Sequence, residues 1–423
     1  MNRSLPQPEP NPNSRDASRF GLLRHRAYAR FLFVRIAASI ALQVQAVAVG
    51  WQMYELTRSP FQLGLVGLVQ FIPSIGLFLV TGHAADRYDR RVVTFAAQFA
   101  EACAVATLAL ANATGRLSPG LLLAMAFVIG TGRAFEQPSL QSSLPNIVPA
   151  DVLPRAIAGS TSASQIAIVA GPALGGLLIA LSPTLVFASC AALWLSSGLV
   201  MRGIAMQRAT PKREPVDMKT LLGGLAFIGR HKVVLGAILL DLFAVLFGNA
   251  MALLPIFARD IFMSGPLSFG MLRAAPAAGA LLSALTLTRW PIAGRVGRIM
   301  FGAVATFGIG TILLALSPSL PFGMAAMFIV GAADTVSVVI RQSLLLLHTP
   351  DEMRGRVFAV GSMFTGTSNQ LGDFRAGAAA ALFGTVPAVL IGGLSTLTVV
   401  LVSTRIFRQL YRADRYGPAD QAP

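Results

Sequence analysis

The chain has 423 residues, of which 54% are hydrophobic and only 12% are charged. A soluble domain carries about 25% charged residues, so this composition argues against a soluble protein. A net charge of +16 would favour a nucleic-acid partner in a soluble chain. In a chain this apolar, basic residues serve first as topology signals, and no nucleic-acid partner is expected.

Apolar runs long enough to cross a bilayer as helices, about 20 residues each, follow one another along the chain. The alternating ten-residue segments of a membrane barrel are absent, so each run is predicted to be a helix. The first run lacks the short apolar core and small-residue cleavage site of a signal peptide, and we predict that it is retained. In chain order, spans 1 to 12 are predicted over residues 28–54, 61–81, 92–113, 119–144, 156–181, 183–204, 233–258, 266–288, 299–317, 320–346, 357–383 and 385–408.

Lys and Arg are distributed unevenly between the predicted loops. Of the 34, 26 lie in the N-terminal tail, the even-numbered loops and the C-terminal tail or at the span ends beside them, and only Arg58, Arg116 and Arg259 lie in odd-numbered loops. Because basic loops stay on the cytoplasmic side, both termini are predicted to be cytoplasmic in a bacterial plasma (inner) membrane. Contacts with anionic membrane lipids are expected for these charges.

The longest polar stretch within the chain, residues 208–232, separates two halves that resemble each other. "SPFQLG" (59–64) matches "GPLSFG" (265–270) at an offset of 206. Parallel repeats of six spans are the architecture of the major facilitator class, which places the substrate site between the halves. At an offset of 201, Pro149, Arg155, Gly171 and Gly176 match Pro350, Arg356, Gly372 and Gly377.

The predicted fold is therefore an all-α integral membrane protein with twelve transmembrane helices in two pseudo-symmetric six-helix bundles. Within the linker, Met218, Leu222 and Ile228 recur at helical spacing, which favours an interfacial helix or a solvated connector with a few packed residues. The predicted boundaries are a cytoplasmic tail (1–26), a first bundle (27–204), a cytoplasmic linker (205–232), a second bundle (233–408) and a cytoplasmic tail (409–423).

The sequence contains few residues arranged as a catalytic site would require. Cys103 and Cys190 both lie inside predicted spans, which argues against a disulfide framework. No His, Cys and carboxylate cluster has the spacing of metal ligands, and no nucleophile motif is present. We therefore expect no catalysis, no metal and no cofactor.

The loop between spans 2 and 3 reads "GHAADRYDRR" (82–91). Asp86 can accept hydrogen bonds at a helix end, and three arginines can bind the cytoplasmic surface and the opposite half. Such bonds would lock one conformation and yield in another. A loop that only sets topology would explain the arginines but not the acid and the glycine. The predicted conformational latch consists of Gly82, Asp86, Arg87, Arg90 and Arg91.

Span 5 contains "GPALGG" (171–176), with Gly171, Pro172, Gly175 and Gly176. The proline removes a helix hydrogen bond, and the glycines allow close approach of another backbone. Ordinary glycine-rich packing is the alternative.

These stretches, with "VAVGWQMYELTRSPFQLGLVGLVQF", "LLGGLAFIGRHK" and "TPDEMRGRVFAVGSMFTGTSNQLGDFRAG", resemble the enterobactin-exporter and drug-efflux branch of the major facilitator superfamily. The resemblance extends from about residue 20 to 408. It implies that the 82–91 loop is the superfamily's loop signature, that "GPALGG" is its antiporter motif, and that spans 1, 4, 7 and 10 line the central cavity. One departure is Arg133, which follows the span 4 glycines although the drug-pump signature has an Arg before them.

Apart from arginines at the cytoplasmic span ends, ten charged residues lie within the spans, where each costs a few kcal/mol unless it faces a cavity or another charge. Six of them fall on the four spans that the resemblance places around the cavity. The offset of 206 makes Arg35 equivalent to Asp241, and we predict that they form a coupled pair; snorkelling to the membrane surface is the alternative for Arg35. The ten are Arg35, Glu101, Arg133, Glu136, Asp241, Arg273, Asp334, Arg341, Asp373 and Arg375.

Span 11 carries a polar stripe of Ser362, Thr365, Asn369 and Asp373. Asp373 is the predicted protonatable group, with Asp241, Glu136 and Asp334 as rivals; a purely structural bond to a neighbouring helix is the alternative. Arg375 lies two positions away, so it points to the other side of the helix and is not a partner. The sequence gives Arg375 no role.

The sequence thus predicts a secondary transporter that exports a small amphipathic or siderophore-like molecule by alternating access, with protons as the coupling ion. The candidate proton or substrate site comprises Asp373, Asn369, Arg35, Asp241, Arg133, Glu136 and Asp334. An uptake symporter of the same fold, disfavoured by "GPALGG", and a non-transporting membrane sensor are the alternatives.

Overall fold

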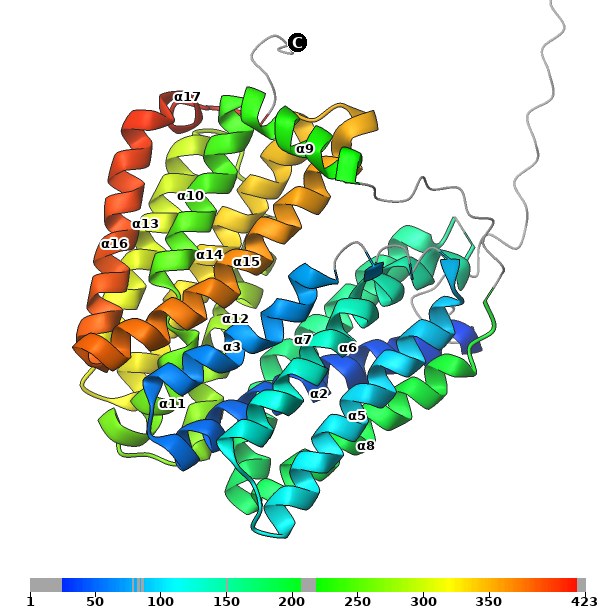
Figure 1. Cartoon of the computed structure of the whole chain (residues 1–423). Coiled ribbons are helices and arrows are strands. Elements are labelled where there is room, and N and C mark those ends of the chain that lie inside the picture. Colours follow the sequence, from blue (N-terminus) through cyan, green and yellow to red (C-terminus); the bar gives the residue numbers. More distant parts are fainter. Residues whose placement is uncertain are drawn as a thin grey trace, which may run out of the picture.

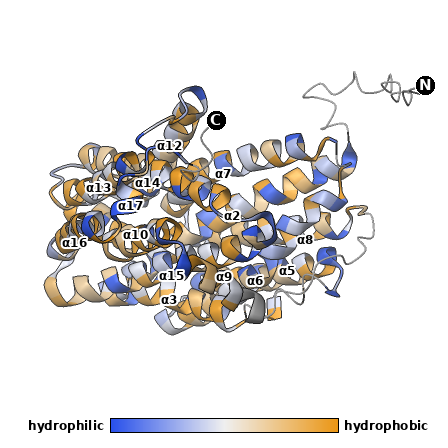
Figure 2. Ribbon diagram, turned by 90° about the horizontal axis from the view of Figure 1, so that it is seen from above, coloured by the Kyte–Doolittle hydropathy of each residue, from blue (hydrophilic) through white to orange (hydrophobic). Residues whose placement is uncertain are grey.

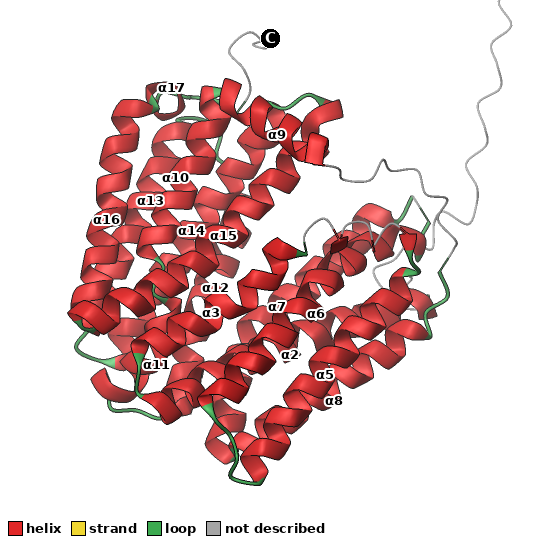
Figure 3. Cartoon of the chain, in the orientation of Figure 1, coloured by secondary structure: helices red, strands yellow, loops and turns green. Residues whose placement is uncertain are grey.

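The computed structural model describes residues 25–77, 80–81, 84, 87–149, 151–206 and 218–416. Within these residues the chain is helical and has no strand (Figure 3). Helices occur at all twelve predicted spans. Spans 1 to 6 are α2 (Arg26–Thr57), α3 (Pro60–Gly76), α5 (Arg90–Ala113), α6 (Pro119–Ser143), α7 (Leu153–Leu181) and α8 (Pro183–Arg202).

The second six spans follow in the same order, with one difference. Span 7 is not continuous: α10 (Lys232–Gly248) is followed by a 3-10 turn η3 (Met251–Leu253), a short α11 (Leu254–Ile256) and a π-helical turn η4 (Phe257–Ile261). Spans 8 to 12 are α12 (Pro266–Arg289), α13 (Val296–Ala315), α14 (Leu320–Leu347), α15 (Asp351–Phe383) and α16 (Thr385–Ile406).

Nine helices among the described residues are long and apolar enough to cross a membrane. Of the helices at the twelve predicted spans, the three outside this group of nine are α3, α6 and α15. Of these, α3 has only 17 residues, and α6 and α15 carry intramembrane charges such as Arg133, Glu136 and Asp373. The twelve-helix fold predicted from the sequence is confirmed.

Three helices of the first half begin with the same Ser-Pro dipeptide. The side chains of Ser59, Ser118 and Ser182 accept hydrogen bonds from backbone N–H groups three residues later. A serine cap accepts a hydrogen bond from a backbone N–H group that has no partner within the helix. Proline has no backbone N–H group, so it leaves no donor without a partner in the first turn. The Ser-Pro pair therefore favours a helix start at this point. These starts all lie at the end of the molecule opposite the linker, which we call the far end; the end with α9 (Met218–Arg230) and α17 (Arg408–Tyr411) is the linker end.

The helices form two groups that meet at the far end and diverge toward the linker end (Figure 1). Hydrophobic residues cover the helices of both groups (Figure 2). At the far end one apolar cluster includes both groups, with Trp51 stacked on Phe269 at 5.9 Å between ring centroids. Near the linker end the clusters are separate, one around Phe31 and Met201 and others around Phe301 and Val357. The packed core is therefore shared only at the far end.

Two glycine-lined seams join the groups. In the first, between α7 and α12, a Cβ on Gly176 would lie 2.6 Å from the Pro266 carbonyl oxygen and 3.0 Å from the Cα of Gly270. In the second, between α15 and α3, a Cβ on Gly377 would lie 2.6 Å from the Pro60 oxygen and 2.8 Å from the Cα of Gly64. Gly64 and Gly270 differ by 206 positions and Gly176 and Gly377 by 201, so the matched glycines of the repeats are the seam residues.

Gly377→Ala should therefore lower the thermal unfolding midpoint in detergent, because the added methyl group has no space against the backbone of α3 and overpacking costs about 1–3 kcal/mol. Gly366→Ala, in the same helix, is the matched control. A Cβ at Gly366 meets nothing within 4 Å, so its midpoint should stay unchanged or rise. Equal midpoints for the two variants would contradict the seam.

The linker contains a helix, as its spacing predicts. One side of α9 packs on α15, where a Cβ on Gly224 would lie 2.9 Å from the Arg356 carbonyl oxygen and Ile228 is buried. Leu222 and Leu225 remain exposed, which suits a helix at a membrane surface. Most of the predicted N-terminal tail, residues 207–217 of the linker and residues 417–423 of the C-terminal tail lie outside the described residues.

Candidate functional site

The break in span 7 lies beside the charged residues of span 11. α10 ends at Gly248, and Asn249 and Ala250 are not helical. A helix end in the membrane leaves carbonyl and N–H groups that need partners. Arg375 supplies donors: its Nε binds the Leu246 carbonyl oxygen at 2.9 Å and its Nη2 the Asn249 carbonyl oxygen at 3.4 Å.

Asp373 supplies the matching acceptor. Its Oδ1 accepts a hydrogen bond from Asn249 Nδ2 at 3.1 Å, and its carboxylate also accepts one from the backbone N–H of Ala252. Asp373 therefore binds the start of the far-end piece of span 7, residues 251–261, whereas Arg375 binds the end of α10. No ion pair joins Asp373 and Arg375 among the described residues, although their charges interact; both residues bind the same break.

Asp373 also lies at the seam between the two groups. A Cβ on Gly67 of α3 would lie 3.2 Å from the Asp373 Cβ and 3.7 Å from its Oδ2. Arg273 of α12 interacts with Asp373 electrostatically. The carboxylate thus lies where α3, α12, α15 and the break in span 7 come together.

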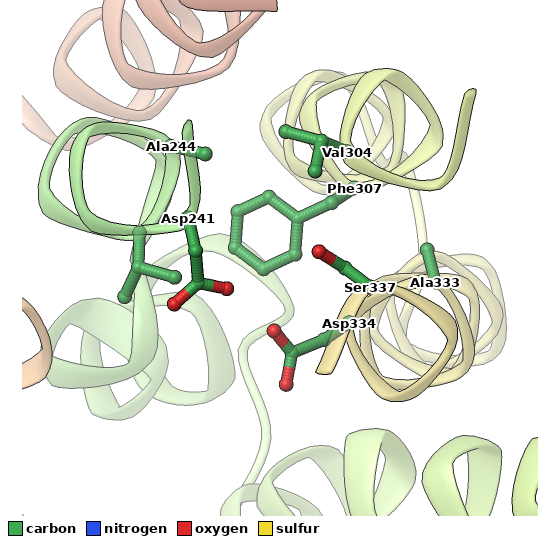
Figure 4. A pocket seen from close by; sticks show the side chains of 8 residues that line it. Asp241, Ala244, Val304, Phe307, Ala333, Asp334 and Ser337 are labelled. Atoms are coloured by element: carbon green, nitrogen blue, oxygen red, sulfur yellow. The ribbon is translucent and has the colours of Figure 1, made fainter. Parts of the chain in front are cut away.

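A second charged cluster lies between spans 7, 10 and 11. Asp241 of α10 forms an ion pair with Arg341 of α14, at 3.2 Å between Oδ2 and Nη2, and both side chains are almost fully buried. Arg341 Nη1 also donates to Thr365 of α15 at 2.9 Å. Asp334 lines the same small pocket as Asp241 (Figure 4), where the two carboxyl groups lie on either side of one gap beside Phe307.

The predicted pairing of Arg35 with Asp241 is not a contact in this structure. Asp241 pairs with Arg341, in its own half, and Arg35 interacts electrostatically with Glu136, also in its own half. An offset between repeats identifies equivalent positions, and equivalent positions lie in different bundles. Equivalent positions need not touch. The ion-pair partner of Asp241 is Arg341, not the predicted Arg35.

The first half has its own cluster around Glu136 of α6. Glu136 Oε1 accepts a hydrogen bond from Gln98 Nε2 at 2.7 Å, and Arg133 interacts with it electrostatically. Glu101 lies beside them, because a Cβ on Gly132 would be 2.7 Å from its Cγ. Both carboxylate oxygens of Glu101 are buried and have no hydrogen-bond partner among the described residues.

The two halves carry opposite charges at equivalent positions. Gly130 packs on Gln70 as Gly331 packs on Pro276, which confirms the offsets of 201 for span 4 and 206 for span 2. By the same offsets, Arg35 corresponds to Asp241 and Arg133 to Asp334. The packing of the repeat is kept, but the sign of the charge is reversed.

The polar stripe of span 11 faces spans 7 and 10. Asn369 donates to the Thr365 carbonyl oxygen at 2.9 Å, and its own carbonyl oxygen accepts from Asn249 at 3.2 Å. Ser362 and Asn369 are exposed. The stripe therefore connects the break in span 7 with the Asp241–Arg341 pair.

Ion pairs join the two groups at the far end. Glu55 of α2 pairs with Arg259 of η4, and Asp260 of η4 binds both Arg58, at 3.4 Å, and the Tyr54 hydroxyl group, which donates to it. We call these five residues the far-end gate. The four charged side chains are partly exposed, so each ion pair contributes at most about 1 kcal/mol.

Removing both ion pairs of the far-end gate, as Glu55→Gln with Asp260→Asn, should raise the population open at that end by about fivefold, which corresponds to about 1 kcal/mol. Spin labels at Arg116→Cys and Ser319→Cys, in a chain with Cys103 and Cys190 replaced, measure the distance across the groups. Asp351→Asn is the control, because it removes only the exposed pair with Arg354. An unchanged distance distribution in the gate variant would contradict this role.

The structure describes part of the predicted latch. Arg90 donates to the Ser142 carbonyl oxygen at 2.7 Å, and Arg91 binds Asp89 at 2.6 Å and the Ile204 carbonyl oxygen at 3.1 Å. Both hold the start of α5 to neighbouring segments of the first half. Arg87 is exposed. Gly82 and Asp86 lie outside the described residues, so the latch stays a prediction.

The span 5 motif makes the close backbone contacts expected of it. A Cβ on Gly171 would lie 2.5 Å from the Cβ of Gln43, and one on Gly175 would lie 3.1 Å from the Cα of Val44. Gly176 and the Pro172 carbonyl oxygen instead meet Gly270 of the other group. The motif thus packs one helix on two neighbours.

Sequence reasoning missed the far-end gate, Glu101 as a cluster member, and Arg341 as the partner of Asp241. Applying the 206 offset to the ends of spans 1 and 7 would have placed Tyr54 opposite Asp260. No comparable signal marks Glu101, because span 3 was not expected to line the cavity.

Known proteins share both the sequence pattern and the fold. The family profile described as "Transmembrane secretion effector" matches residues 17–419. The enterobactin exporter EntS of Shigella dysenteriae serotype 1 (strain Sd197) is 26% identical over 400 residues, covering 92% of this chain and 95% of that protein. EntS of Escherichia coli O139:H28 (strain E24377A / ETEC) matches equally, with the same identity and coverage.

Solved structures agree on the fold. A bacterial homologue of the human lysosomal transporter Spinster, inward-facing and occupied, superposes with a TM-score of 0.71 at 16% identity, covering 94% of this chain and 99% of that one. A bacterial homologue of the iron transporter ferroportin, in an inward-facing state, gives 0.64 at 18% identity, covering 91% and 98%. The chain is thus an integral inner membrane protein, and it belongs to the transmembrane secretion effector family of major facilitator superfamily transporters.

Proposed function

We propose that this transporter exports a small amphipathic or siderophore-like molecule from the cytoplasm by alternating access, in exchange for protons. The observation that carries the proposal is the buried Asp241–Arg341 pair with Asp334 beside it. Two carboxyl groups share one guanidinium group, so one acid lacks a compensating cation. Burial disfavours a second charged carboxylate, and binding a proton removes that cost.

The direction of access follows from topology. The excess of basic residues in the tails and even-numbered loops supports a cytoplasmic linker end. The separate clusters at that end and the seams at the far end then correspond to an inward-facing state. In this state a cytoplasmic substrate enters between the groups, and opening of the far end releases it outside.

Two separate acidic sites divide the proton cycle in this proposal. Asp373, held at the seam against Gly67, is exposed to the outside only when α3 and α15 part, so it takes up the proton. Asp334 and Asp241 release the proton toward the cytoplasm; they lie on spans 10 and 7, which the family resemblance places around the central cavity. The substrate class rests on the enterobactin exporters that resemble this chain and on the mixture of charged and apolar groups around these spans.

Proteoliposomes that contain the purified protein test the proposal, with enterobactin and ethidium as separate probes. An imposed proton gradient should drive accumulation against the probe's gradient, and a protonophore should abolish it. Movement with the protons instead of against them would establish an uptake symporter. No movement of either probe under a gradient would favour a non-transporting sensor.

A further inference from the structure

The outer piece of span 7, residues 251–261, is bonded at its start by Asn249 and Asp373 and at its other end by side chains of α2. At its start, Asn249 Oδ1 accepts the Met251 N–H at 3.0 Å, Asp373 accepts the Ala252 N–H, and the Ala250 carbonyl oxygen accepts the Leu253 N–H at 3.0 Å. The first donors of the new helix are therefore satisfied without α10. At its other end, Arg259 and Asp260 form the far-end gate.

The carbonyl oxygens at the end of α10 also find partners without the outer piece. In a continuous helix the Leu246 and Asn249 carbonyl oxygens would accept bonds from residues 250 and 253. Here both accept from Arg375, and Leu253 donates elsewhere. Arg375 therefore occupies the positions that a continuous span 7 would need for its own hydrogen bonds.

We infer that span 7 works as two helices that move separately, and that Arg375 is a positioning residue that keeps them apart by capping the inner one. The inference rests on the alternating access proposed above. Its outer piece carries the gate residues Arg259 and Asp260, and hydrogen bonds of Asp373 and Asn249 link its inner end to span 11. Opening the far end then requires the outer piece to leave span 1 and to shift against the rest of its own half.

Movement within one half distinguishes this inference from rigid rocking of two halves. Spin labels at Met263→Cys and Ser319→Cys report the position of the outer piece within the second half, since Met263 directly follows it and is 83% exposed. Labels at Leu382→Cys and Ser319→Cys report two rigid helix ends of the same half. Labels at Arg116→Cys and Ser319→Cys report opening across the halves.

All three distances are measured in the full chain, with Cys103 and Cys190 replaced, before and after the Glu55→Gln/Asp260→Asn change. We expect the distance across the halves to lengthen, the Met263–Ser319 distance to shift by several ångströms, and the Leu382–Ser319 distance to stay constant. Opening with an unchanged Met263–Ser319 distance would overturn the inference and leave alternating access intact. A distance across the halves that never changes would contradict alternating access, and the inference with it.

Arg375 variants test the positioning role with the gate intact. Arg375→Met keeps the length but donates no hydrogen bond, so the Met263–Ser319 distribution should shift or broaden and enterobactin efflux should fall about tenfold. Arg375→Lys retains a charged donor and should keep most of the native Met263–Ser319 distribution and most of the efflux. Arg289→Met, at an exposed position on α12, is the matched control. If Arg375→Met does not fold, a native distribution and full efflux in Arg375→Ala would overturn the role, as would efflux in Arg375→Lys no better than in Arg375→Ala.

Discussion

Arg341→Met should abolish proton-driven export and destabilise the protein by about 3–5 kcal/mol. The change leaves Asp241 buried without its 3.2 Å ion pair and removes the donor to Thr365, while Asp334 remains close by. Two uncompensated carboxylates in low-dielectric surroundings are costly, and the protein must then fold with both of them neutral. Efflux from proteoliposomes and thermal unfolding in detergent measure the two effects.

A double-mutant cycle checks that the loss comes from the pair. Asp241→Asn with Arg341→Met should recover part of the lost stability, giving a coupling energy of about 1–3 kcal/mol. The same cycle for Asp241 with Arg35 should be additive, because they lie in different halves and each has a closer partner. Wild-type efflux in Arg341→Met would show that the pair does not take part in transport.

Asp373→Asn should lower gradient-driven export by at least about tenfold while substrate binding changes by less than about twofold. The amide oxygen can still accept the bonds from Asn249 and Ala252, so the break in span 7 keeps its shape. What is lost is the charge that faces Arg273 and Arg375 and the ability to take up a proton. Equilibrium binding and proton-driven efflux, measured on the same preparation, separate binding from coupling.

The control for this variant lies in the same helix. Asp351→Asn removes an exposed carboxylate at the first turn of α15 and should leave both measurements unchanged. Efflux by Asp373→Asn that is undiminished and keeps its pH dependence would remove Asp373 from proton coupling. Its role would then be limited to capping the outer piece of span 7.

The sequence was sufficient for the fold because hydropathy and helix starts are local properties. Ser-Pro pairs at residues 59, 118 and 182 mark helix starts directly. The glycines matched by the repeats lie at the seams, where close backbone approach requires glycine on both sides, but their sequence pattern did not predict that they join the two halves. Their partners could be named only from the structure.

The break in span 7 and the function of Arg375 could not be predicted. Residues 233–258 form one apolar run, and Asn249 alone does not end a helix. The cause lies in span 11, more than 100 residues away, whose side chains replace the missing backbone bonds. Arg375 binds carbonyl oxygens and forms no ion pair with a described residue, so a search for ion pairs passes over it.

The position of the seams makes the helices act as long lever arms. Gly270 lies in the first turns of α12, and Gly377 lies near the end of α15, so both points of contact are close to the far end. From there about 20 residues of α12 and about 26 of α15, roughly 30–40 Å, extend to the linker end. A rotation of about 10° at such a fulcrum moves the helix ends there by about 5–7 Å, so a small displacement at the seam becomes a several-fold larger one at the linker end.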